Sequence, residues 1–213
     1  MGKDIRLNTL SKLTIPELIK LQAHEYGDKY ALVTEQQNIT YAELEAQSTE
    51  IAKNLINIGV DKGDRIAIWA PNMNEWVLAA IATHKAGAVI VPINTRMKGK
   101  EAAYILNNSE AKILFSVNDF LGVDYFDLLS EEALPHLQKQ IALDETESPN
   151  ASNLKSLMVS GLAIDLPLVE EGDIADIIFT SGTTGKPKGV ISTHGQNIRV
   201  FDYWSTYVGL NQD

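Results

Sequence analysis

The sequence contains no cysteine. Disulfide bridges, thiolate catalysis and cysteine-bound metal sites are therefore excluded, which is in keeping with a reducing compartment. Basic residues are also in the minority, with 18 Lys and Arg against 28 Asp and Glu and a net charge of −10. Such a charge argues against nucleic acid and anionic membranes as partners. We therefore expect a cytoplasmic protein that binds neither of them.

Long apolar runs are missing as well. A membrane-spanning helix needs roughly 20 apolar residues, and the longest candidate, residues 76–93, is interrupted by His84, Lys85 and Gly87. The N-terminal segment carries charges but lacks the apolar region of a signal peptide. We expect no transmembrane segment. With 45% hydrophobic residues in a chain of 213, a sizeable core can nevertheless form.

What the sequence does have is a repeated alternation of short apolar runs and amphipathic stretches. Capping boxes at Thr14 and Thr40 predict the starts of two helices, and residues 30–41 read as a small hairpin. Apolar runs bounded by turn residues predict buried strands at 65–71, 88–94, 112–117, 140–144 and 173–180. Stretches with helical periodicity lie at 16–26, 41–58, 74–87, 98–111, 125–138 and 196–209.

This order of elements indicates the fold class. Strands that alternate with helices at short spacing predict an α/β architecture, with a largely parallel sheet flanked by helices. Parallel strands are buried on both faces, which agrees with their unbroken Val and Ile content.

One stretch, residues 177–197, combines four glycines, six hydroxyl side chains and two lysines. Glycines let backbone N–H groups approach an anion, hydroxyls add donors, and lysines add charge suited to phosphate. No acid occurs between Ile177 and Phe201. The stretch is therefore a candidate phosphate cradle.

Two common cradles do not fit. A Walker A loop aligned on Gly185-Lys186 would have Thr180 in place of its first glycine and Pro187 in place of its magnesium-binding hydroxyl. A dinucleotide fingerprint needs Gly-x-Gly-x-x-Gly at the start of a helix. Pro187 disfavours a helix here, and the apolar run at 189–194 predicts a strand instead.

What does fit is a family pattern. FTSGTTGKPKG, Phe179–Gly189, closely resembles the signature of the adenylate-forming superfamily, which comprises acyl-CoA synthetases, firefly-type luciferases and peptide-synthetase adenylation domains. The likeness continues upstream over Ile39–Arg96. GAVIVPINTR, Gly87–Arg96, favours the acyl-CoA ligases over the peptide synthetases, and the segment that follows is similar to ligases of fatty acids and of steroid-derived propanoates.

The resemblance implies a two-step reaction in which a carboxylic acid reacts with ATP to give acyl-AMP, and the thiol of coenzyme A then displaces AMP. It also implies which residues bind the β- and γ-phosphates of ATP. These are Thr180, Ser181, Gly182, Thr183, Thr184, Gly185 and Lys188. Lys186 stands at a position that varies in the family and ranks below Lys188. The Thr180 hydroxyl is expected to join the Mg²⁺ shell, and no catalytic residue is expected in this chain.

The resemblance covers only the N-terminal part of such enzymes. The family motifs for adenine, ribose and magnesium, and the C-terminal lid domain, are not in the sequence. We therefore expect residues 1–213 to be the N-terminal part of an AMP-binding domain, inactive alone, with exposed edges that favour a homodimer. Two alternatives stay open: a non-catalytic nucleotide-binding or interaction module, and an amino-acid-activating adenylation domain.

Histidines and tryptophans have structural interpretations at this stage. His194 is expected to be a structural residue at the start of the last helix. His24, His84 and His136 are not at metal-ligand spacing. Trp204 is expected to pack in the core.

Overall fold

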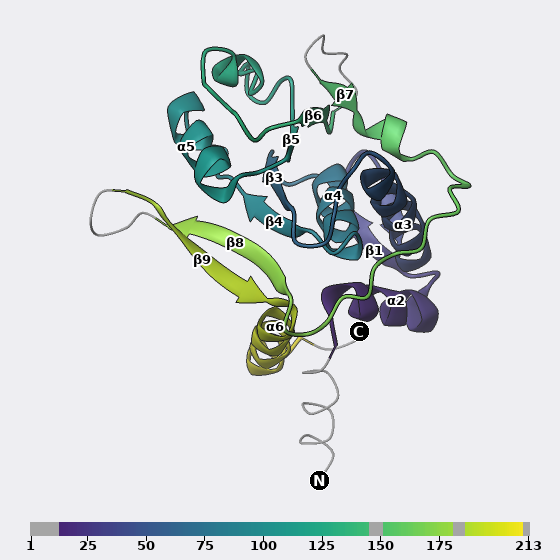
Figure 1. Ribbon diagram of the computed structural model, residues 1–213. Coiled ribbons are helices and arrows are strands. Elements are labelled where there is room, and N and C mark those ends of the chain that lie inside the picture. Colours follow the sequence, from purple (N-terminus) through teal and green to yellow (C-terminus); the bar gives the residue numbers. More distant parts are fainter. Residues whose placement is uncertain (1–12, 145–150, 181–185, 211–213) are drawn as a thin grey trace.

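The computed structural model describes residues 13–144, 151–180 and 186–210. A seven-stranded sheet of order β7-β6-β5-β3-β4-β8-β9 forms its centre (Figure 1). Its strands are β3 (Arg65–Trp69), β4 (Val89–Pro92), β5 (Ile113–Ser116), β6 (Lys139–Ala142), β7 (Ser152–Asn153), β8 (Ile174–Thr180) and β9 (Lys188–Thr193). The strands are parallel except for the β8–β9 pair, so the expected α/β class with a largely parallel sheet is confirmed.

The chain changes direction across the sheet at β3. From β3 it passes to β4 on one side and then returns to β5 on the other. Because such crossovers are right-handed, α4 (Asn74–Lys85) and α5 (Gly99–Ser109) lie on opposite faces of the sheet. The connections that follow β3 and β5 therefore leave these neighbouring strands in opposite directions, so the topological switch point, where α/β sheets usually bind ligands, lies between β3 and β5.

Three helices form the layer on the α4 face. α2 (Ile15–Tyr26) and α3 (Tyr41–Asn57) pack on α4 and on each other (Figure 1). Both begin with the expected capping boxes, at Thr14 and Thr40. The expected hairpin is formed by β1 (Tyr30–Val33) and β2 (Asn38–Thr40).

A buried lysine joins two of these helices. The Lys85 ammonium donates to the Glu45 carboxylate at 2.6 Å, to the Glu45 carbonyl at 2.8 Å and to the Thr49 hydroxyl at 2.8 Å. All three of its N–H donors are thus used. Because an uncompensated buried charge is costly, this arrangement fixes α4 against α3.

The predicted helix at 125–138 is wrong. The structure has only a 3₁₀ turn, η1 (Asp127–Leu129), in this stretch. The Asp124 carboxylate accepts from the backbone N–H groups of Phe126 and Asp127, which favours a turn over a helix, and Pro135 cannot continue a helical hydrogen-bond ladder. A second 3₁₀ turn, η2 (Leu154–Leu157), follows β7.

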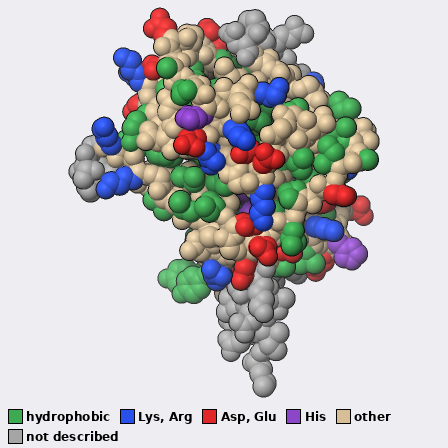
Figure 2. Space-filling view, in the orientation of Figure 1, with side chains coloured by type: hydrophobic (Ala, Val, Ile, Leu, Met, Phe, Trp, Pro, Cys, Tyr) green, Lys and Arg blue, Asp and Glu red, His purple; other side chains and the backbone are tan. Residues whose placement is uncertain are grey.

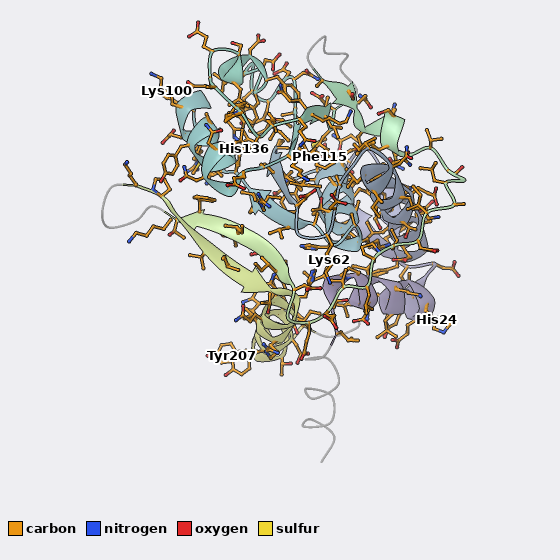
Figure 3. All side chains as sticks on the ribbon, viewed as in Figure 1. His24, Lys62, Lys100, Phe115, His136 and Tyr207 are labelled. Carbon is orange, nitrogen blue, oxygen red and sulfur yellow. The ribbon has the colours of Figure 1, made fainter. Side chains whose placement is uncertain are left out.

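The prediction that Trp204 packs in the core is also wrong. Trp204 lies on α6 (His194–Val208) and is 57% exposed. It belongs to an apolar stripe on the side of α6 away from the body, made of Val200, Phe201, Tyr203, Trp204, Tyr207 and Val208. Figure 3 labels Tyr207 at this outer surface, and Figure 2 shows the hydrophobic side chains there.

None of the described helices is long and apolar enough to cross a bilayer.

Gly99→Ala tests the contact between α5 and the η1 turn. A Cβ at this position would lie 1.9 Å from the Leu128 carbonyl oxygen, so backbone must move. We expect a loss of about 1–3 kcal/mol in the free energy of unfolding, measured by urea denaturation. Gly172→Ala is the control, because its Cβ would meet nothing within 4 Å. Equal stabilities of the two variants would contradict this packing.

Candidate nucleotide-binding site

The carboxyl ends of the parallel strands meet at one edge of the sheet. β3 ends at Trp69, β4 at Pro92 and β8 at Thr180, and β4 pairs in parallel with both β3 and β8. The segments that follow these strands therefore lie together at the carboxyl edge of the sheet, next to the switch point between β3 and β5. One of them is the glycine-rich stretch identified in the sequence.

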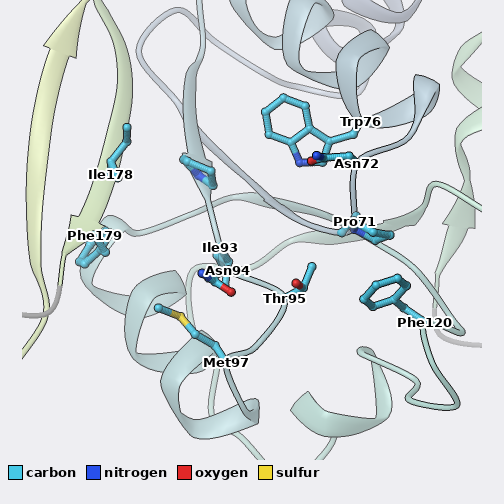
Figure 4. A pocket seen from close by; sticks show the side chains of 12 residues that line it. Pro71, Asn72, Trp76, Ile93, Asn94, Thr95, Met97, Phe120, Ile178 and Phe179 are labelled. Carbon is cyan, nitrogen blue, oxygen red and sulfur yellow. The ribbon is translucent and has the colours of Figure 1, made fainter. Parts of the chain in front are cut away.

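A pocket of about 560 Å³ opens at this edge. Figure 4 shows its walls, which combine aromatic side chains with amides and one hydroxyl. The segments after β3 and β4 contribute Asn72 and Asn94, whereas Trp76 belongs to α4 and Phe179 to β8. A concave, mostly apolar surface with a few polar groups is typical of small-molecule sites.

The glycine-rich stretch is carried by the β8–β9 hairpin. Thr180, the last residue of β8, pairs with Lys188, the first residue of β9. Lys186 is exposed, and Figure 2 shows basic side chains at this end of the hairpin. The other expected phosphate ligands, Ser181, Gly182, Thr183, Thr184 and Gly185, lie outside the described residues.

Two contacts fix the hairpin near its tip. The Tyr104 hydroxyl on α5 donates to the Pro187 carbonyl at 3.2 Å. At Gly189 a Cβ would lie 2.8 Å from the Ile177 side chain of the facing strand, so the glycine permits the close packing of the two strands. Both contacts lie beside Lys188.

A half-buried carboxylate lies further back in the hairpin. Asp176 on β8 accepts a short hydrogen bond from the Asn197 amide on α6. Burial raises the pKa of Asp176, although hydrogen bonds from Asn197 and Ser192 act in the opposite direction. Asp176 thereby connects both strands of the hairpin to the first turns of α6.

The structure adds one contact, between His84 and His194, to what the sequence indicated about the histidines. α6 begins at His194, which is fully buried, so its expected position at the start of the last helix is confirmed. His84 is buried against it, with ring centroids 5.0 Å apart, a pairing that spacing in the sequence did not show. Within residues 13–144, 151–180 and 186–210, no three His, Asp or Glu side chains are placed to hold a metal ion.

Comparison with known proteins gives the family. The family model described as AMP-binding enzyme matches residues 19–212. The chain belongs to the AMP-binding enzyme family. The resemblance to adenylate-forming enzymes stated from the sequence is thus confirmed.

Individual relatives in the AMP-binding family support this placement. A 3-[(3aS,4S,7aS)-7a-methyl-1,5-dioxo-octahydro-1H-inden-4-yl]propanoyl:CoA ligase of Mycobacterium tuberculosis is 35% identical over 209 residues, which are 94% of this chain and 40% of the relative. A crotonobetaine/carnitine–CoA ligase of Salmonella agona is 34% identical over 199 residues, 88% of this chain and 38% of the relative. This chain thus spans about two-fifths of the length of these relatives.

Solved structures agree with the fold. The O-succinylbenzoate coenzyme A synthetase MenE of Bacillus subtilis, in complex with AMP, superposes with a TM-score of 0.73 at 27% identity. The superposition covers 95% of this chain and 47% of MenE.

The sequence indicated the hairpin but not the residues that hold it in place. Tyr104, Asp176 and Asn197 carry no motif that marks them, because their roles depend on which elements the fold places side by side. The pocket could have been expected from the switch-point rule, but that rule requires the strand order.

Tyr104→Phe tests the support at the hairpin tip. The change removes one hydroxyl and leaves the Pro187 carbonyl without this donor. We therefore expect the free energy of opening the β8–β9 hairpin to fall by about 0.5–1.5 kcal/mol. Faster hydrogen exchange of the β8–β9 amides is the measurement. Tyr203→Phe removes a hydroxyl from a 70% exposed ring and should have no effect. Unchanged exchange in Tyr104→Phe would show that the bond does not support the hairpin.

Proposed function

We propose that this chain is the phosphate-binding portion of an ATP-dependent, AMP-forming acid–CoA ligase. The observation that carries the proposal is the position of the signature stretch. Thr180 and Lys188 face each other across a hairpin at the switch-point edge of a parallel sheet, beside a pocket of about 560 Å³. Membership of the AMP-binding family gives this geometry its chemistry.

In the proposed reaction a substrate carboxylate oxygen attacks the α-phosphorus of ATP. The bond from this phosphorus to the oxygen bridging to the β-phosphate breaks, and pyrophosphate leaves with its electron pair. The thiol of coenzyme A then attacks the acyl carbon, and AMP leaves. The first step brings two anions together, so donors around the β- and γ-phosphates must stabilise the leaving group.

Lys188 and Thr180 are the described residues proposed for that task. Lys188 supplies a positive charge in a chain of net charge −10, and no acid between Ile177 and Phe201 offsets it. The Ser181–Gly185 backbone and hydroxyls complete the proposed cradle, and Lys186 has a lesser role. Thr180 would supply one hydroxyl to a magnesium ion, which takes most of its other ligands from water and phosphate and neutralises charge on the leaving group.

The proposed acid is of the fatty-acid or steroid-derived kind. Its support is the activity of relatives, one of which is a ligase of a propanoate attached to a ring system. ATP, a carboxylic acid and coenzyme A are the proposed partners. A homodimer of this chain stays a prediction.

Lys188→Ala tests the phosphate contact. Loss of a hydrogen bond to a charged group costs about 1.5–3 kcal/mol, so we expect MgATP affinity to fall about 10- to 100-fold. Titration calorimetry at fixed ionic strength measures it, and Lys186→Ala should have a smaller effect. Lys20→Ala on α2 is the control for net charge. Tripolyphosphate should compete with ATP, whereas adenosine should not; the reverse order would overturn the assignment.

ATP–pyrophosphate exchange tests the completeness of the site. Because this chain lacks the family motifs for adenine and ribose, we expect it to bind ATP weakly and to catalyse no exchange with any carboxylic acid. Radiolabelled pyrophosphate detects the reaction. Exchange catalysed by the purified chain would show that residues 1–213 hold a complete adenylation site.

A further inference from the structure

A buried histidine contacts both ends of the hairpin. His84 lies in the last turn of α4 and is 7% exposed. Its Nε2 is 3.1 Å from the Ala175 carbonyl oxygen. A carbonyl only accepts, so Nε2 carries the proton and donates to β8, the strand that enters the hairpin.

His194 completes the arrangement from the other end. It is the first residue of α6, the helix that leaves the hairpin. Its Nδ1 accepts from the Ile15 backbone N–H at 3.4 Å, which places the proton of the neutral ring on Nε2. Its ring meets the His84 ring edge to face, at 73° and 5.0 Å between centroids.

We propose that His84 and His194 form an acid-sensitive latch that fastens the β8–β9–α6 unit, residues 174–180 and 188–208, to the α/β body. In this latch His84 is a positioning residue, because one side chain holds the strand before the hairpin and the helix after it. Both rings are neutral in the closed latch. Protonation of either opens the unit while the parallel sheet β3–β5 stays folded.

The burial of the His84 ring explains why a positive charge on it would destabilise the closed latch. His84 Nδ1 is buried and has no hydrogen-bond partner among the residues that the structure describes. Protonation would turn it into a donor with no acceptor, which is costly in a buried site. A second charge on His194 would add repulsion between two rings in contact.

The surrounding charges do not compensate. Glu17 of α2 and Asp173 before β8 favour the charged form of His194, whereas Lys62 opposes it and is itself paired with Asp173 at 2.7 Å. Burial lowers the pKa of His194 to about 4. Burial, followed by repulsion from His194, lowers the pKa of His84 to about 3, and the bond to Ala175 only partly offsets them.

The direction of the pH effect follows from these pKa values. An opened unit exposes both rings, whose pKa then returns to roughly 6.5. Below that pH the open form binds more protons than the closed form, so stability is lost as pH falls. Between pH 7.5 and 5.5 the opening equilibrium should rise about tenfold per histidine, and about 100-fold for both.

NMR titration of the intact chain, without nucleotide, is the first test. We expect the ring signals of His84 and His194 to hold their neutral shifts for the closed form between pH 7.5 and 5.5. A normal titration of His84 in the folded chain would overturn the proposal.

Hydrogen exchange against pH is the second test. After correction for intrinsic rates, amides of β8, β9 and α6 should lose about 100-fold protection from pH 7.5 to 5.5, and those of β3 and β5 should not. His84→Gln keeps a donor of similar reach but cannot be protonated, so the change should shrink to about tenfold. His136→Gln is the matched control and should leave it unchanged.

The outcomes separate the latch from the proposed function. An unchanged pH dependence in His84→Gln, or equal loss of protection in β3 and β5, would overturn the latch. Neither measurement includes nucleotide, so failure of ATP binding would leave the latch unaffected. Figure 3 labels the control histidine, His136, well apart from Lys62, which is one of the groups that act on His194.

Discussion

The parallel pairing of β8 with β4 is the constraint on which the rest of the site depends. It places Asp176 opposite Ile90 and so joins the late part of the chain to a sheet built much earlier in the sequence. Because parallel strands end at the same edge, the pairing brings the end of β8 to the carboxyl edge of the sheet, where β3 and β4 also end. Without it the glycine-rich stretch would have its backbone donors but no pocket beside them.

Buried polar side chains hold the layers in register with that sheet. Lys85 donates all three of its N–H groups to acceptors on α3, and the His84 ring donates a hydrogen bond to the β8 backbone. Such groups are costly to bury unless each finds its partner, so they permit one arrangement of helices rather than adding much net stability. α6 differs, because its apolar stripe has no cover within the described part of the chain. In ordinary proteins a face of that kind marks an interaction surface.

Much of the fold could be predicted because its signals are local. Capping boxes at Thr14 and Thr40 define helix starts through side chain–backbone bonds within four residues, and apolar runs define the buried strands. The predicted helix at 125–138 failed because Asp124 and Pro135 override a helical period. Trp204 failed because a sequence shows that a residue is apolar, not whether anything covers it. For the site, the signature stretch was visible, whereas Tyr104, Asp176 and the His84–His194 contact were not.

The sequence by itself determined the family, the α/β alternation and the stretch suited to phosphate, because each depends on the order of nearby residues. The tertiary structure decided the strand order, the pocket at the switch point, and which distant side chains support the hairpin. These depend on contacts between segments far apart in the chain, and no local pattern specifies them. The sequence does not distinguish an exposed histidine, such as His136, from one that is buried against a second ring, such as His84. Burial, which sets its chemistry, is a property of the assembled layers.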